Sequence, residues 1–124
     1  MQTSPPAFST DVVPVAGVED ASSVVLRGRA TYDQAQRLRS ELLERVETAT
    51  TSKLVLFLGD VERMDTAGAA VVVEALRLGH ELGKKVLICS ASPSVVGMFR
   101  LAGFEEALEF CTSCPEETLQ RLTA

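Results

Sequence analysis

This sequence of 124 residues has no long apolar run, no excess of positive charge and little histidine or cysteine. No run approaches the roughly 18 apolar residues that a membrane-spanning helix needs, so we expect no direct membrane insertion. The net charge of -5 argues against a nucleic-acid partner, because neutralising phosphates requires clustered Lys and Arg. Residues 1–10 have neither the basic start nor the apolar core of a signal peptide, and we expect a cytoplasmic protein.

The few histidines and cysteines limit the chemistry that the chain can perform. His80 is the only histidine, and its place late in a predicted helix favours a surface residue. We therefore predict no catalytic residues. Cys111 and Cys114 have C-x-x-C spacing, but Cys89 and His80 do not complete the four ligands of a zinc site. We predict no metal site and no cofactor, and a thiol enzyme built on the C-x-x-C pair stays open as a third alternative.

The most informative segment is an apolar strand followed by a helix. Residues 54–58 are five consecutive apolar residues, which predict a parallel strand buried on both faces. Further along, apolar residues recur at helical spacing from Ala69 to Gly79, and Asp65 and Thr66 lie where this helix begins. Both are good N-caps, because their side-chain oxygens accept hydrogen bonds from the first-turn amides. A phosphate on Thr66 would be stabilised there, since a helix N-terminus attracts anions.

Strands and helices alternate along the chain, which predicts one α/β domain with a mainly parallel sheet. We expect residues 1–10 to be disordered and residues 11–124 to form this domain. A capping box at Thr31 and Gln34 predicts the start of the first helix, and Gly103 is the expected C-cap of a later helix. The remaining predictions are strands at 11–16, 23–28, 86–90 and 108–111, helices at 93–102 and 115–122, and buried helical residues Ala35, Leu38, Leu42, Val46 and Ala49.

The segment around Thr66 resembles the signature of STAS domains, the family of bacterial anti-sigma factor antagonists and of cytoplasmic modules of sulfate transporters. Asp65-Thr66-Ala67-Gly68 fits the family pattern of Asp-Ser-Ser-Gly or Asp-Thr-x-Gly after a hydrophobic strand. Residues 24–28, 85–94 and 99–104 also match in order. The resemblance implies a STAS fold: a mainly parallel sheet of four to five strands with an antiparallel edge strand, and helices packed mostly on one face.

The resemblance also implies a function without catalysis. It suggests a regulatory module, an anti-sigma factor antagonist that binds a kinase-like anti-sigma factor and is switched by phosphorylation. In that family the residue after the Asp is the phosphoacceptor, which is Thr66 here. The expected partner surface around it consists of Asp65, Ala67, Gly68, Ala70 and Glu74. The alternative is a STAS subunit of a phospholipid-transport ABC complex, which the Asp-Thr-Ala-Gly spelling also resembles, and whose Thr contacts an ABC ATPase subunit.

Overall fold

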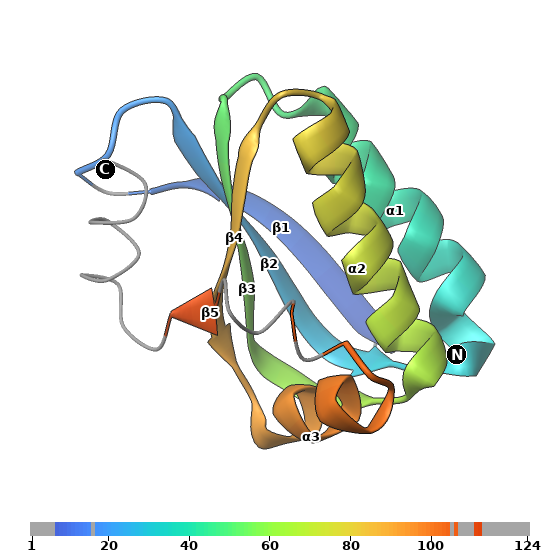
Figure 1. Cartoon of the computed structure of the whole chain (residues 1–124). Coiled ribbons are helices and arrows are strands. Elements are labelled where there is room, and N and C mark those ends of the chain that lie inside the picture. Colours follow the sequence, from blue (N-terminus) through green and yellow to red (C-terminus); the bar gives the residue numbers. More distant parts are fainter. Residues whose placement is uncertain (1–6, 16, 105, 107–110, 113–124) are drawn as a thin grey trace, which may run out of the picture.

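The computed structural model describes residues 7–15, 17–104, 106, 111 and 112. Its five strands form one sheet in the order β1-β2-β3-β4-β5 (Figure 1). β1 is antiparallel to β2, and the other neighbouring strands are parallel, which confirms the predicted sheet. The elements are β1 (Phe8–Pro14), β2 (Ala21–Ala30), the 3-10 helix η1 (Tyr32–Gln34), α1 (Ala35–Thr48), β3 (Lys53–Met64), α2 (Thr66–Glu81), β4 (Lys85–Ala91), α3 (Pro93–Leu101) and β5 (Cys111–Thr112).

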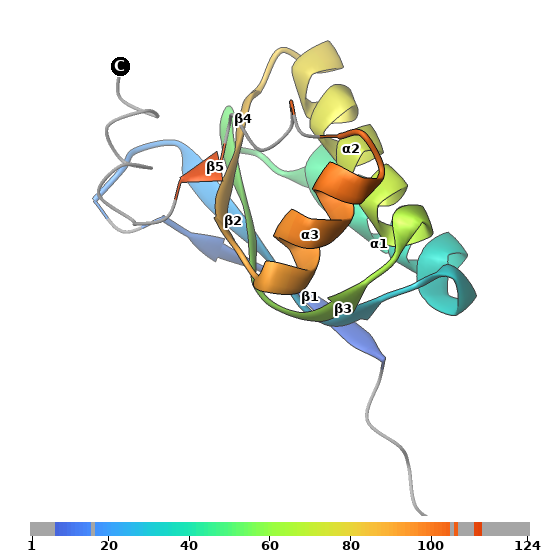
Figure 2. The same ribbon diagram turned by 60° about the horizontal axis from the view of Figure 1, so that its bottom comes forward.

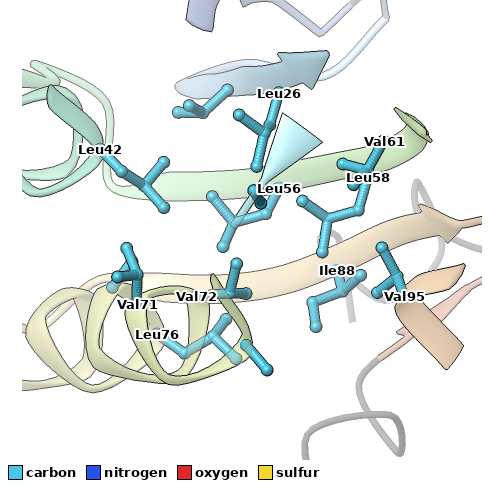
Figure 3. Packing of buried hydrophobic residues seen from close by; sticks show 14 of the residues in the cluster. Leu26, Leu42, Leu56, Leu58, Val61, Val71, Val72, Leu76, Ile88 and Val95 are labelled. Atoms are coloured by element: carbon cyan, nitrogen blue, oxygen red, sulfur yellow. The ribbon is translucent and has the colours of Figure 1, made fainter. Parts of the chain in front are cut away.

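The helices cover one face of the sheet. Figures 1 and 2 show α1 and α2 side by side on that face, with α3 beside the end of β4. Leu54, Leu56 and Leu58 of β3 belong to the cluster that these helices bury, and Figure 3 shows Leu56 and Leu58 within it. Val55 instead belongs to a second cluster, with Leu87 and other residues. Because successive side chains of a strand point to opposite faces, β3 is buried on both faces, as its apolar run predicts.

Strands β1 to β4 all extend beyond their predicted bounds, and the causes are clear for β1 and β3. β1 begins at Phe8, three residues before the expected start at Asp11, so residues 8–10 lie in the sheet and not in a disordered segment. This follows from the burial of Phe8 and Thr10, which are 4% and 5% exposed. β3 continues through the polar stretch to Met64, because Val61 and Met64 are buried in the helix-side core. Register shifts between β2 and β3 break the alternation there. Alternation of apolar and polar residues therefore does not predict this extension.

The capping box predicted at Thr31 and Gln34 is wrong. The Thr31 side chain caps no amide, and its hydroxyl donates a hydrogen bond to Asp33 Oδ1 at 2.5 Å. The chain forms η1 before it enters α1, and the N–H of Tyr32 finds its acceptor on another element. α1 itself is placed as predicted: it buries Leu38, Leu42 and Val46, with Ala35 and Ala49 packed partly buried against the core.

The last described elements agree with the sequence in part. Ser92 is the N-cap of α3 and accepts from the N–H of Val95 at 3.4 Å. The C-cap is Ala102, and the predicted Gly103 follows it with φ +79°, a conformation that favours glycine. β5 overlaps the predicted strand 108–111 at Cys111. Residues 108–110 and the predicted helix 115–122 lie outside the described residues. In the part of the chain that is described, no helix has the length and apolarity to cross a membrane.

Candidate functional site

One carboxylate joins the N-terminal ends of two helices. Asp65 is the N-cap of α2, and its Oδ1 accepts a hydrogen bond from the N–H of Gly68 at 3.0 Å. Its Oδ2 accepts a second hydrogen bond, from the N–H of Tyr32 at 2.7 Å. Tyr32 is the first residue of η1, which leads directly into α1. Asp65 therefore fixes the start of α2 through the ordinary N-cap interaction and the start of η1 through a contact that bridges the two elements.

Gly68 lies where α2 approaches the end of β2. A Cβ atom on this glycine would lie 2.0 Å from the carbonyl oxygen of Ala30. That same oxygen accepts a hydrogen bond from the N–H of Asp65 at 3.2 Å. Gly68 is buried, so its predicted place in a partner-binding surface is wrong. The residue is needed for close packing, because only glycine lets the helix backbone come this near to the strand.

Thr66 is the first helical residue of α2 and is exposed. The N-cap is Asp65, so the Thr66 hydroxyl is not used to begin the helix. The N–H groups of Thr66 and Ala67 point out of the first turn, where a helix offers them no acceptor. They also carry the positive end of the helix dipole. An anionic group on the Thr66 oxygen would meet attractive amides and, beside them, the negative charge of Asp65.

The predicted partner surface around Thr66 combines small side chains with a carboxylate that forms an ion pair. Ala70 is exposed, as predicted, and Ala67 is half-buried. Glu74 accepts three hydrogen bonds from Arg39 of α1, with Nη2–Oε1 at 2.6 Å, Nε–Oε2 at 2.8 Å and Nε–Oε1 at 3.0 Å. These hydrogen bonds hold the pKa of Glu74 below its ordinary value and raise the pKa of Arg39. Glu74 is thus a bridge between α1 and α2 and not a free surface carboxylate.

Tyr32 and Arg39 are residues of this region that the sequence did not single out. Tyr32 is 82% exposed, and it lies inside the four residues whose pattern predicts a capping box. The local pattern therefore predicted a helix cap in this segment and not a residue of the site. Arg39 is 35 residues from Glu74, and no spacing rule connects residues so far apart. The one available signal was that Tyr32 is the only tyrosine of the chain.

Other candidate residues do not assemble into a second site in the described part of the chain. His80 is exposed, and Cys89 is a buried free thiol. The described residues contain no group of three His, Cys, Asp or Glu placed to hold a metal ion. Cys111 lies in β5, whereas Cys114 falls outside the described residues. A role for the C-x-x-C pair stays a prediction.

A protein-family model described as "Mlab, STAS domain" matches residues 13–110 of the chain. The chain belongs to the STAS domain family. This membership agrees with the geometry around Asp65, because α2 begins at Thr66 directly after β3 and Asp65 caps it, the order of strand and helix that the family signature predicts. The resemblance found in the sequence is confirmed for the family and for the fold.

Three solved structures of similar fold include anti-sigma factor antagonists and a sulfate transporter family protein. An anti-sigma factor antagonist from Mycobacterium paratuberculosis is 17% identical with a TM-score of 0.71, covering 99% of this chain and 100% of that one. The phosphorylated form of the Bacillus cell fate determinant SpoIIAA is 13% identical with a TM-score of 0.62, covering 92% and 99%. A sulfate transporter family protein from Wolinella succinogenes is 21% identical with a TM-score of 0.67, covering 86% and 87%. At these identities the likeness establishes the fold.

Proposed function

We propose that this STAS domain is a regulatory module of the anti-sigma factor antagonist type that has no catalytic activity of its own. In this proposal it binds a kinase-like anti-sigma factor in the cytoplasm and is switched by phosphorylation of Thr66. The observation that carries the proposal is the placement of Thr66: an exposed hydroxyl at the first position of a long helix, directly after the family's Asp. That position is the phosphoacceptor in the antagonists that the sequence resembles, and one similar structure is of a phosphorylated antagonist.

Electrostatics gives the proposed switch its direction. A phosphate on Thr66 adds about 1.5 to 2 negative charges and three strong acceptor oxygens. The free amides of the first turn stabilise these charges in the unbound protein. In the complex the same charges lie beside Asp65 at a contact from which water is excluded, and a partner has to desolvate both. Repulsion and desolvation then release the partner, which supplies the ATP and the chemistry of the transfer.

The partner surface in this proposal consists of Asp65, Thr66, Ala67 and Ala70, with Glu74 at its margin. The alanines leave the surface shallow next to Thr66, because Ala70 is exposed and Ala67 is half-buried. A helix or loop of the partner can approach such a surface closely. Gly68 is not included, since it is buried against Ala30.

The test is phosphorylation in vitro by the cognate kinase-like protein with ATP, followed by mass spectrometry. We expect one phosphate per chain on Thr66 and none on Thr66→Ala. Thr50→Ala is a matched control, because Thr50 is an exposed threonine in the loop between α1 and β3. Thr66→Ala is expected to keep the fold, since Asp65 provides the cap of α2. Phosphate on another residue of the wild-type protein contradicts the assignment of Thr66.

A second candidate function is that of the STAS subunit in a phospholipid-transport ABC complex. It is favoured by the Asp-Thr-Ala-Gly spelling at residues 65–68, and by the matching family model, whose description names Mlab. In that case Thr66 contacts an ATPase subunit and receives no phosphate. Purification of the tagged chain from its own cells distinguishes the two, because a stable complex with an ABC ATPase and a permease replaces the kinase-like partner.

A further inference from the structure

The Tyr32 side chain projects into solvent next to the candidate site. Its residue is 82% exposed, and the other exposed large hydrophobic residues in the described part of the chain are aliphatic. Exposed aromatic rings are typical anchors of protein interfaces, since they bury a large area with few rotatable bonds. The phenol group adds a hydrogen-bonding end to the ring. Tyr32 thus has the chemistry of an interface residue and, in the free chain, no described residue covers it.

We propose that Tyr32 is a contact residue for the protein partner that binds around Thr66, and that the Asp65 carboxylate transmits the charge state of Thr66 to Tyr32. This inference rests on the proposed function and deepens it, because it extends the partner surface from α2 to the start of η1. The partner that fits is a protein with an apolar pocket for the ring and an acceptor for the phenol O–H. Tyr32 is the contact residue whose position changes with the charge state of Thr66, and Asp65 is a positioning residue.

The proposed link is competition for the N–H groups that Asp65 holds. A phosphate on Thr66 repels the neighbouring carboxylate and offers acceptor oxygens to the same amides. The two hydrogen bonds of Asp65 differ in how they are supported. The Gly68 amide lies three residues from the cap within one helix turn, so the helix itself holds it in place. The Tyr32 amide is 33 residues away on another element, so this bond yields first.

The surrounding contacts confine the change to the start of η1. Arg39 and Glu74 keep α1 and α2 together through two short hydrogen bonds. The N–H of Asp65 stays on the carbonyl of Ala30, 3.2 Å away. Next to Tyr32, the Asp33 carboxylate already accepts from the Thr31 hydroxyl, and the Tyr32 carbonyl accepts from the N–H of Ala35. Asp65 is the group that holds the Tyr32 N–H. Loss of this one bond therefore moves Tyr32 without separating the helices.

The link can be tested in the free protein without a kinase. Thr66→Glu places a negative charge at the position, and Thr66→Gln is the neutral control of the same shape. Asp65→Asn removes an acceptor from Tyr32 while it keeps an equally good N-cap for Gly68. We expect solvent exchange of the Tyr32 amide, measured by ¹⁵N NMR, to become about tenfold faster in Thr66→Glu and Asp65→Asn, the ratio that the loss of a charge-assisted hydrogen bond produces. In Thr66→Gln it is expected to stay at the wild-type value.

A second readout uses the unique tyrosine of the chain. Fluorotyrosine labelling gives a single ¹⁹F signal, which we expect to shift in Thr66→Glu and not in Thr66→Gln. Equal behaviour of the Glu and Gln variants in both measurements overturns the proposed transmission. So does a Tyr32 amide whose exchange is unchanged in Asp65→Asn. These outcomes are independent of whether a kinase ever modifies Thr66.

The contact is tested with the kinase that phosphorylates Thr66 as the binding partner. Tyr32→Ala is expected to weaken binding at least tenfold, whereas Leu101→Ala is expected to bind like the wild type. Leu101 is a matched control on α3, because it is 78% exposed compared with 82% for Tyr32. Wild-type affinity in Tyr32→Ala overturns the contact even if Thr66 is phosphorylated. If no kinase acts on Thr66, the proposed function fails, and the exchange measurements still decide the link between Asp65 and Tyr32.

Discussion

Replacing Gly68 by alanine tests how closely α2 is packed against the end of β2. The new Cβ would lie 2.0 Å from the carbonyl oxygen of Ala30, and real Cβ atoms essentially never come within 3.0 Å of another heavy atom outside the neighbouring residues. The first turn of α2 therefore has to move away from β2 by about 1 Å, the difference between these two distances. The neighbouring atom is backbone, so no side-chain rotation relieves the clash. The movement also stretches the hydrogen bond from Asp65 N–H to the same oxygen, at 3.2 Å.

The magnitude follows from two opposing effects. Overpacking of this kind destabilises a fold by about 1 to 3 kcal/mol, and a weakened hydrogen bond adds about 1 kcal/mol. Alanine is more favourable than glycine inside a helix by about 1 kcal/mol, which offsets part of the loss. We expect Gly68→Ala to lower the free energy of unfolding by about 1 to 3 kcal/mol, measured by urea unfolding followed by circular dichroism.

Gly97 in α3 provides the matched control, because a Cβ atom built there meets nothing within 4 Å. Gly97→Ala is expected to raise the free energy of unfolding by up to about 1 kcal/mol, through helix propensity alone. The two substitutions are chemically the same, so the difference between them isolates the contact with Ala30. If both variants change stability by the same amount, α2 does not pack against β2 as closely as described, and the argument for Gly68 fails.

Three further predictions concern the surface and the thiols. Ala70→Arg is expected to leave thermal stability nearly unchanged, because Ala70 is exposed, and to abolish partner binding in a pull-down by clash and by burial of an unpaired charge; an unfolded variant would contradict the described helix phase. Because Arg39 lowers the pKa of Glu74, the pair stabilises the fold above the ordinary glutamate pKa of 4.5 and loses this contribution as the pH falls through the lowered value. This contribution is small, since both side chains are about half exposed and screened by solvent. Glu74→Gln should flatten the dependence of the free energy of urea unfolding on pH in that acidic range. Cys111→Ser combined with Cys114→Ser is expected to leave partner affinity unchanged, because we predict no metal site at this pair. One equivalent of zinc in the purified wild-type protein would contradict that prediction.

The elements that the sequence predicts well are those whose pattern is local. The five apolar residues of 54–58 indicate a strand buried on both faces, and β3 places Leu54 and Val55 in clusters on opposite faces. The spacing of Leu38, Leu42 and Val46 likewise predicts the buried stripe of α1. In both cases the periodicity of the side chains within one element contains all the information required.

The interactions that the sequence does not reveal connect distant segments. Thr31 and Gln34 satisfy the local pattern of a capping box, yet the Tyr32 amide is taken by Asp65, 33 residues further along. The start of β1 at Phe8 depends on Phe8 packing into a core built by other elements. Gly68 was assigned to the surface from its place in a motif, whereas its position is determined by the Ala30 carbonyl of β2. Each of these requires the assembled sheet and helices.

The residues of the Asp-Thr-Ala-Gly motif have different structural roles, so a match to the motif does not support the fold and the function equally. Asp65 caps α2 and orients Tyr32, and Gly68 permits the approach to Ala30. Both are required by the architecture, so they are expected in a STAS domain of either candidate function. Only the exposed Thr66 and the surface beside it are left unconstrained by packing. A match to the whole motif therefore establishes the fold more firmly than the switch, and experiments on Thr66 and its exposed neighbours are the ones that separate an antagonist from a transporter subunit.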